Sequence, residues 1–318
     1  MIYFSLKYRL MKRTAGIFGD RKLLSCSADE LRKRYSKNLH VINFPDRAVS
    51  KKLEYERRLE HGVLSTFLTH RDSIQALLYI PDKKMLQFPV AKDYKLFERL
   101  ALETGRDVII PYCLPCIEHA MNESVDMIYE VYRHLIPEYG EGNVAVAGCS
   151  TGGALALALI SHINARGENV PMPDKLYVSS PEMCICSQGE RERAEKLDKT
   201  DIFVPVKWLD TYYDLITNGS ELPQYMPYPQ LGNYAGLKEA YVSFADCEVL
   251  YAMCDDLVSR MKSAGVQVTL EVGQGMYHGY PVNDIVRDSF WGHINMIDYL
   301  KAVPAWKKLV TAPGVYPV

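Results

Sequence analysis

The stretch Val144-Ala-Val-Ala-Gly-Cys-Ser-Thr-Gly-Gly-Ala154 decides the fold of this chain. Its apolar beginning predicts a buried strand, and the apolar residues that continue to Ala165 predict a helix. Between them, Gly148-Cys-Ser-Thr-Gly152 matches Gly-x-Ser-x-Gly, in which a serine lies on a sharp turn between a strand and a helix. Such a turn lifts Ser150 Oγ above the sheet edge and points the Thr151 N–H at the place where an oxyanion forms. The alternative interpretation is an ordinary glycine-rich turn.

Strands and helices alternate on both sides of this stretch. Short apolar runs are typical of buried strands, and the segments between them have the period of amphipathic helices. This alternation predicts an α/β fold, with a mainly parallel sheet covered by helices on both faces. Residues 50–70 are expected to add an antiparallel hairpin at the sheet edge. The expected strands are 76–80, 108–110, 143–147, 176–178, 241–244 and 266–272, and the expected helices are 93–103, 124–136 (ended by Pro137), 154–165, 249–263 and 284–302.

Three polar residues follow later strands of the predicted sheet. Asp246 and Glu248 come just after residues 241–244, and His278 follows residues 266–272. The order serine, acid, histidine is that of a hydrolase triad built on a parallel sheet. In that arrangement His278 takes the Ser150 proton, and one carboxylate holds the imidazole in the correct tautomer. Position alone does not choose between the two carboxylates, and the other one is then an ordinary loop or helix N-terminal charge.

From about residue 70 to its end, the chain resembles the hormone-sensitive-lipase-like branch of the α/β-hydrolases, which contains bacterial acetyl esterases and carboxylesterases. The resemblance implies an α/β-hydrolase core of residues 46–182 and 236–318, and a helical cap, or lid, of residues 1–45 and 183–235. It favours Glu248 as the acid of the triad and leaves Asp246 in reserve. The matching pieces are Ala76 to Ile80, Leu100 to Gly105, Pro111-Tyr112 through Glu118-His119, Gly148 to Gly153, Ser180-Pro181, Glu248-Val-Leu250, Ala264-Gly-Val266 and Gly275-Met-Tyr-His-Gly279.

The chain departs from this family after residues 76–80. The family has His-Gly-Gly-Gly there, whereas this chain has Pro81-Asp82-Lys83-Lys84. Asp82 and Lys83 keep N–H groups and join Thr151 as oxyanion candidates, but their side chains restrict a backbone that glycine leaves free. The Asp82 carboxylate would repel an oxyanion, and the Lys83 ammonium would attract it.

Three hypotheses follow. The first is a serine carboxylester hydrolase that acts on short-chain, acetyl-type esters through Ser150, His278 and Glu248. The alternative is a catalytically weakened or non-catalytic ligand-binding protein on a hydrolase scaffold. An amide or peptide hydrolase with the same triad is a third option.

Composition limits the partners. The 318 residues carry 37 basic and 39 acidic side chains, and this balance argues against a nucleic-acid binder. Residues 1–60 are basic, with 15 Lys and Arg against 7 Asp and Glu. This excess favours a solvated helical face over the alternative, a basic arm that contacts an anionic membrane or ligand. No apolar run reaches the roughly 18 residues of a membrane-spanning helix, and charges interrupt the N-terminus too early for a signal peptide. We therefore expect a cytoplasmic protein without stable membrane insertion, with a small-molecule ester as its partner and no cofactor. A homodimer stays open.

Six of the eight cysteines fall near the predicted site. Cys113-x-x-Cys116 and Cys184-x-Cys186 follow strands, as do Cys149 and Cys247. Four thiolates can hold zinc, but Cys-x-Cys spacing is poor for such a site, so we expect buried thiols and no metal. The inserted segment is rich in aromatic residues that either line a substrate pocket or pack the cap onto the core: Trp208, Tyr212, Tyr213, Tyr225 and Tyr228.

Overall fold

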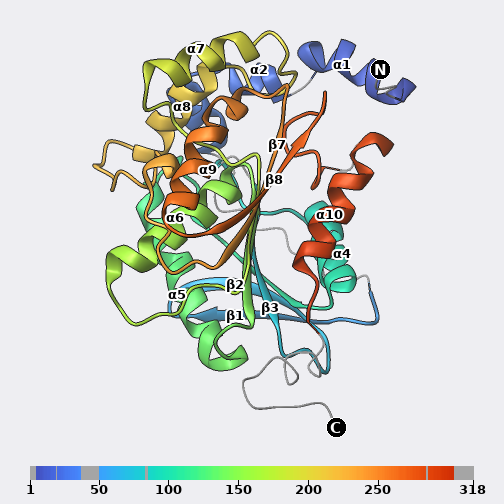
Figure 1. The fold of residues 1–318 in the computed structure, drawn as a ribbon, viewed down its shortest axis with the longest axis vertical. Coiled ribbons are helices and arrows are strands. Elements are labelled where there is room, and N and C mark those ends of the chain that lie inside the picture. The colour runs from blue at the N-terminus through green and yellow to red at the C-terminus, as the bar shows by residue number, and fades with distance from the viewer. Residues whose placement is uncertain (1–4, 19, 37–49, 83–84, 284–285, 304–318) are drawn as a thin grey trace.

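The computed structural model describes residues 5–18, 20–36, 50–82, 85–283 and 286–303. Within them, eight strands form one twisted sheet in the order β1-β2-β4-β3-β5-β6-β7-β8 (Figure 1). Strands β3 to β8 run parallel, and the hairpin β1–β2 joins β4 in antiparallel fashion at one edge. The predicted parallel sheet and edge hairpin are therefore confirmed. The strands are β1 (Glu54–Glu60), β2 (Val63–Thr69), β3 (Ala76–Ile80), β4 (Asp107–Pro111), β5 (Val144–Cys149), β6 (Leu176–Ser179), β7 (Glu239–Ala245) and β8 (Gln267–Gly273).

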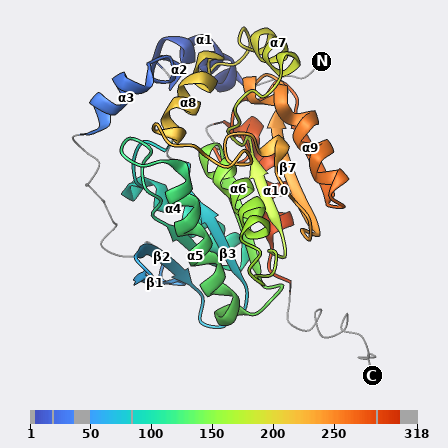
Figure 2. The ribbon, with the colours of Figure 1, turned by 90° about the vertical axis from the view of Figure 1, so that its left-hand side faces the viewer.

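Helices cover both faces of the sheet (Figures 1 and 2). Successive side chains of a strand point to opposite faces, so Leu78 of β3 packs with the α5, α6 and α9 side and its neighbour Leu77 packs with the α4 and α10 side. Both faces of the central strands β3 to β6 are buried, which explains why these strands are continuous, largely apolar runs. These helices are α4 (Tyr94–Thr104), α5 (Met121–Tyr139), α6 (Thr151–Arg166), α9 (Cys254–Ser263) and α10 (Phe290–Leu300).

The remaining helices gather at one end of the sheet, shown at the top of Figure 1. They are α1 (Leu6–Phe18), α2 (Asp20–Leu24), α3 (Ala28–Tyr35), α7 (Gln188–Leu197) and α8 (Lys207–Thr217). Arg21 of α2 joins the two groups, since its guanidinium contacts the Asp198 carboxylate and donates to the carbonyls of Asp201 and Val204. The N-terminal helices and the inserted segment therefore form one layer, although residues 37–45 of the predicted cap lie outside the described residues. Trp208 and Tyr212 of α8 are fully buried in the core, so these two aromatics pack rather than line a cavity.

Several helix ends differ from the prediction. The expected helix 249–263 opens with a 3₁₀ turn, Val249–Met253, so α9 begins only at Cys254. Helix α5 continues past Pro137 to Tyr139, because a proline in the last turn removes only one backbone hydrogen bond, and Gly140 then ends the helix with its N–H on the Ile136 carbonyl. The expected helix 284–302 is wrong at its start: residues 287–289 form a single 3₁₀ turn, and α10 begins only at Phe290. Residues 284–285 lie outside the described chain.

No helix among the described residues is long and apolar enough to cross a membrane.

Candidate functional site

Ser150 lies on a strained turn between β5 and α6. Its φ of 55° and ψ of −123° fall in a region that residues with a side chain rarely adopt. A Cβ at Gly148 would overlap the Gly152 carbonyl, and one at Gly152 would overlap the Ile80 carbonyl of β3. The two glycines are therefore required by the close crossing of strand and helix, which gives the serine its sharp turn.

His278 and Glu248 meet at the same end of the sheet. The loop after β8 carries His278, whose Nδ1 lies 2.8 Å from Glu248 Oε2. The other carboxylate oxygen, Oε1, accepts hydrogen bonds from Ser180 Oγ and the Ala245 N–H, both at 2.8 Å. Ser180 Oγ in turn accepts from the Gly279 N–H at 2.9 Å. Glu248 is 1% exposed and His278 is 8% exposed, so this pair is buried and held from three strand ends.

Asp246, the reserve acid, has a different contact. Its Oδ1 accepts a hydrogen bond of 2.6 Å from the Gly275 N–H, at the start of the loop that carries His278. The described hydrogen bonds and ion pairs of His278 include Glu248 and not Asp246. The geometry therefore assigns the imidazole to Glu248 and the support of its loop to Asp246.

A third carboxylate, Glu182, contacts the serine. Ser150 Oγ donates to Glu182 Oε1 at 3.3 Å, and the Glu182 N–H donates to the Ser150 carbonyl at 3.0 Å. In the described chain no hydrogen bond joins Ser150 to His278. Sequence reasoning missed Glu182, although its place directly after Ser180-Pro181, at the end of β6, was a usable signal.

The charges around His278 change its protonation. Burial alone would lower its pKa, but the hydrogen bond and charge of Glu248, with the charges of Glu182 and Asp201, raise the pKa of His278 to about 9. Asp201, from the loop between α7 and α8, was also missed by sequence reasoning. Burial raises its pKa to about 6, against three stabilising hydrogen bonds from the backbone N–H groups of Phe203, Val204 and Val249.

The predicted oxyanion residues are partly described. Thr151 is the first residue of α6, so its backbone N–H has no hydrogen-bond acceptor within the helix. Its hydroxyl donates to Asp82 Oδ1 at 3.0 Å, so the Asp82 carboxylate lies beside the helix N-terminus. Lys83 lies outside the described residues.

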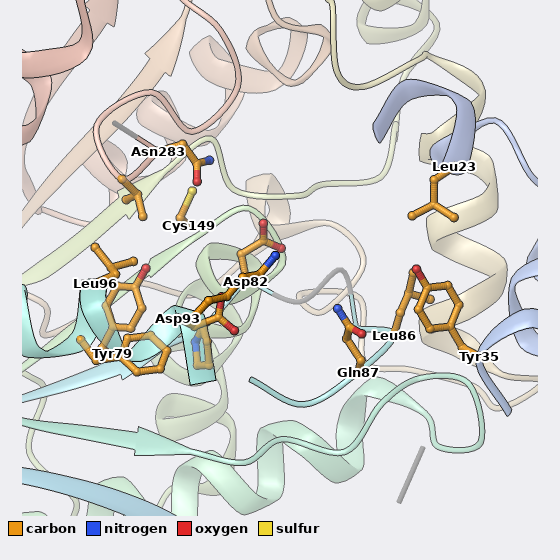
Figure 3. Close-up of a pocket in the computed structure, with 14 residues that line it drawn as sticks. Leu23, Tyr35, Tyr79, Asp82, Leu86, Gln87, Asp93, Leu96, Cys149 and Asn283 are labelled. Atoms are coloured by element: carbon orange, nitrogen blue, oxygen red, sulfur yellow. The ribbon is translucent and has the colours of Figure 1, made fainter. Parts of the chain in front are cut away.

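A cavity of about 340 Å³ opens beside the elbow (Figure 3). Cys149, the residue before the serine, lines it together with Asp82, Asp93 and Asn283. Tyr35 of α3 faces these residues from the opposite wall in Figure 3. The cavity therefore lies between the core and the N-terminal helices.

The cysteines are present as free thiols. Burial raises the pKa of Cys113 to about 12 and raises that of Cys116 further, so these thiols stay protonated. Among the described residues, no group of three or more His, Cys, Asp or Glu side chains is placed to hold a metal ion.

Comparison with known proteins agrees with this fold. Residues 88–282 match the model of a family described as having the alpha/beta hydrolase fold. The chain belongs to this α/β-hydrolase family. Within it, the chain is 25% identical over 228 residues to Esterase LipU of Mycobacterium tuberculosis, covering 70% of this chain and 74% of that protein.

Solved structures support the same fold. An esterase of the bacterial hormone-sensitive lipase family superposes with a TM-score of 0.76 at 20% identity, over 94% of this chain and 99% of that one. A putative esterase from Staphylococcus aureus superposes with a TM-score of 0.72 at 20% identity, over 86% of this chain and 90% of that one. The resemblance to hormone-sensitive-lipase-like esterases is thus confirmed, and these relatives are all described as esterases.

Proposed function

We propose that this α/β-hydrolase is a serine carboxylester hydrolase for short acyl esters. The observation that carries the proposal is a strained elbow serine at the sheet end where a buried histidine is paired with a buried carboxylate. With Nδ1 of His278 on Glu248, the other ring nitrogen, Nε2, is left to exchange a proton with the reacting oxygen.

The reaction follows from this arrangement. Ser150 Oγ bonds to the carbonyl carbon of the ester while its proton passes to His278 Nε2. The carbonyl oxygen gains the negative charge, and the Thr151 N–H and the N-terminus of α6 stabilise it. The bond to the alcohol oxygen then breaks, and His278 returns the proton to that oxygen. Water repeats the sequence on the acyl-enzyme, releasing the carboxylic acid and restoring the Ser150 hydroxyl.

The cavity reaches the elbow at Cys149, the residue before the serine, and its size suits a small ester. Its volume of about 340 Å³ is near the lower end of ligand sites, which span roughly 300–1,000 Å³. Polar residues such as Asp82, Gln87 and Asn283 line much of it. In this proposal, helices α1–α3, α7 and α8 act as the cap over the acyl group.

A panel of p-nitrophenyl esters from acetate to decanoate tests the proposal. We expect kcat/KM for acetate and butyrate to exceed that for decanoate by about tenfold or more, which corresponds to roughly 1.4 kcal/mol. Ser150→Ala is expected to lose at least about a thousandfold in kcat. A fluorophosphonate probe is expected to label the wild type and not Ser150→Ala. Equal hydrolysis by the two proteins would refute the assignment.

A second candidate function is ligand binding without turnover. The Asp82 carboxylate, 3.0 Å from the Thr151 hydroxyl, favours it because a negative charge there opposes an oxyanion. A wild-type protein that binds esters but neither hydrolyses them nor reacts with the fluorophosphonate would establish this second function.

A further inference from the structure

We propose that Glu182 is a positioning residue: its buried carboxylate holds the resting Ser150 hydroxyl and acts on His278 through its charge. This inference rests on the proposed ester hydrolysis and deepens it.

Glu182 is fixed to Ser150 at two points. Its N–H donates to the Ser150 carbonyl at 3.0 Å, and its carboxylate accepts from the Ser150 hydroxyl at 3.3 Å. The preceding Pro181 lies close to α6, since a Cβ at Gly153 would be 3.1 Å from the Pro181 Cα. Glu182 is only 2% exposed. Because backbone and side chain are both attached to the elbow, the carboxylate cannot be an accidental neighbour of the nucleophile.

Three carboxylates, each from a different part of the fold, raise the pKa of His278 through their charge, and Glu248 among them also contacts the ring. Glu248 follows β7 and contacts Nδ1, Glu182 follows β6, and Asp201 comes from the loop between α7 and α8. The Asp201 carboxylate also accepts hydrogen bonds from the backbone N–H groups of residues 203, 204 and 249. Of the three, Glu182 alone contacts the Ser150 hydroxyl in the described chain.

This arrangement has a consequence for the resting site. A protonated His278 cannot accept the serine proton, and the Ser150 hydroxyl is meanwhile engaged by Glu182. Attack requires that His278 lose its proton and that the hydroxyl turn from Glu182 to Nε2. Glu248 contacts Nδ1 of the ring whereas Glu182 contacts the Ser150 hydroxyl, so their roles are separable. Removing only the charge of Glu182 is expected to make His278 a base at lower pH, because a nearby negative charge favours the protonated imidazole.

The test is the pH profile of kcat/KM for p-nitrophenyl acetate in Glu182→Gln. The acid limb of the wild type is expected to have its midpoint near pH 9, as His278 does. In Glu182→Gln that midpoint is expected about one pH unit lower, the size typical of one close opposite charge. The amide oxygen still accepts from Ser150, so the alkaline plateau is expected to stay within about threefold, and activity at pH 7 to rise about tenfold.

Three further variants separate charge from shape. Glu182→Asp keeps the charge and is expected to keep the wild-type midpoint. Glu182→Ala loses charge and acceptor, so its midpoint shifts and its plateau also falls. Glu190→Gln is the matched control, because Glu190 is an equally buried carboxylate that contacts Cys186 and Gln230 in the insertion, and its profile is expected to match the wild type.

The outcomes are distinguishable. An active wild type whose profile superimposes on that of Glu182→Gln overturns this inference and leaves the esterase intact. A wild type that neither hydrolyses the ester nor reacts with a fluorophosphonate refutes the proposed function instead. If Glu182→Gln does not fold, the NMR titration of His278 in Glu182→Ala and Glu182→Asp decides. A midpoint that is lower than that of the wild type in Glu182→Ala but not in Glu182→Asp supports the inference, and a midpoint unchanged in both overturns it.

Discussion

At the scale of single residues, the acid of the triad is the choice that the sequence left open. Glu248 and Asp246 follow the same strand, two residues apart, but Glu248 pairs with His278 while Asp246 binds the Gly275 N–H. Glu248→Gln is expected to lower kcat by about a thousandfold or more, because the imidazole loses its orienting charge. Asp246→Asn keeps an acceptor for Gly275 and is expected to stay within about tenfold of the wild type. Steady-state kinetics on p-nitrophenyl acetate decide, and the reverse ranking would move the acid to Asp246.

A second residue-scale prediction concerns Asp82. Its carboxylate lies beside Thr151, where the oxyanion is expected to form. Asp82→Asn removes the charge and keeps an oxygen for the Thr151 hydroxyl. We expect kcat to rise about three- to tenfold with KM little changed, which amounts to roughly 0.7–1.4 kcal/mol of transition-state stabilisation. A fall in kcat would mean that the carboxylate assists the reaction.

The residues that sequence reasoning missed share a physical cause. Ser150 and His278 were predictable because each follows a strand whose end must meet the others at one edge of a parallel sheet. The contact of Glu182 with Ser150 depends on how the backbone turns after Pro181, and Asp201 reaches Val249 only because the insertion folds back. The place of Glu182 after a strand was a signal that it lies at this edge of the sheet, but no local pattern predicts its contact with Ser150 or the return of Asp201 to Val249.

At the scale of elements, the crossing of β5, α6 and β3 leaves no room for a Cβ at Gly148 or Gly152. A Cβ at Gly152 would overlap the backbone carbonyl of Ile80, which a central strand cannot move aside. Gly152→Ala is therefore expected to lower the free energy of unfolding by about 3 kcal/mol or more, or to prevent folding. Gly189→Ala in α7 is the matched control: its Cβ would meet only the flexible Arg193 side chain, at 3.5 Å. Thermal melts followed by circular dichroism compare the two, and an equal effect on Tm would contradict the crossing argument.

The elements themselves were predictable to different degrees. Strands buried on both faces are continuous apolar runs, so their positions follow directly from the sequence. The C-terminal end of α5 and the start of α10 did not follow from the sequence. For α5 the reason is that a proline marks a helix end only where the remaining turn cannot form. Pro137 lies close enough to Gly140 for the final turn to close around it.

At the scale of the whole molecule, one cluster links the N-terminal helices, the insertion and the core. Arg21 contacts the Asp198 carboxylate and the carbonyls of Asp201 and Val204. The Asp201 carboxylate accepts a hydrogen bond from the N–H of Val249, the residue after Glu248. Arg21→Ala is expected to weaken the attachment of α1–α3 and to lower kcat/KM by about threefold to tenfold through the proposed cap. Limited proteolysis checks this, since faster cleavage within residues 5–36 is expected in the variant, and unchanged cleavage would separate the cluster from cap docking.

The same charges that delay the base stabilise the folded molecule, so activity and stability are expected to change in opposite directions with pH. The folded pKa of His278 is about 9, above its ordinary value of 6.5, so the folded state binds this proton more tightly than the unfolded state does. The resulting stability is fully present below pH 6.5 and is lost as the pH rises through 9. We expect Tm to fall by about 5 °C between these pH values, given about 1.4 kcal/mol per pKa unit and a few degrees per kcal/mol. The folded pKa of Asp201 is raised from 3.8 to about 6, so its contribution to stability is present below pH 3.8 and is lost as the pH rises through 6.

His278→Asn isolates this contribution because asparagine does not titrate. Its Tm is expected to be lower than that of the wild type at pH 6 and nearly constant between pH 6.5 and 9, where the wild type falls. Glu182→Gln keeps His278 but weakens its hold on the proton, so the fall in Tm is expected to begin at lower pH, as the rise in activity does. A wild-type Tm that stays level across this window while activity still rises would mean that His278 is not the group whose titration limits activity. The base would then have to be one of the carboxylates of the site.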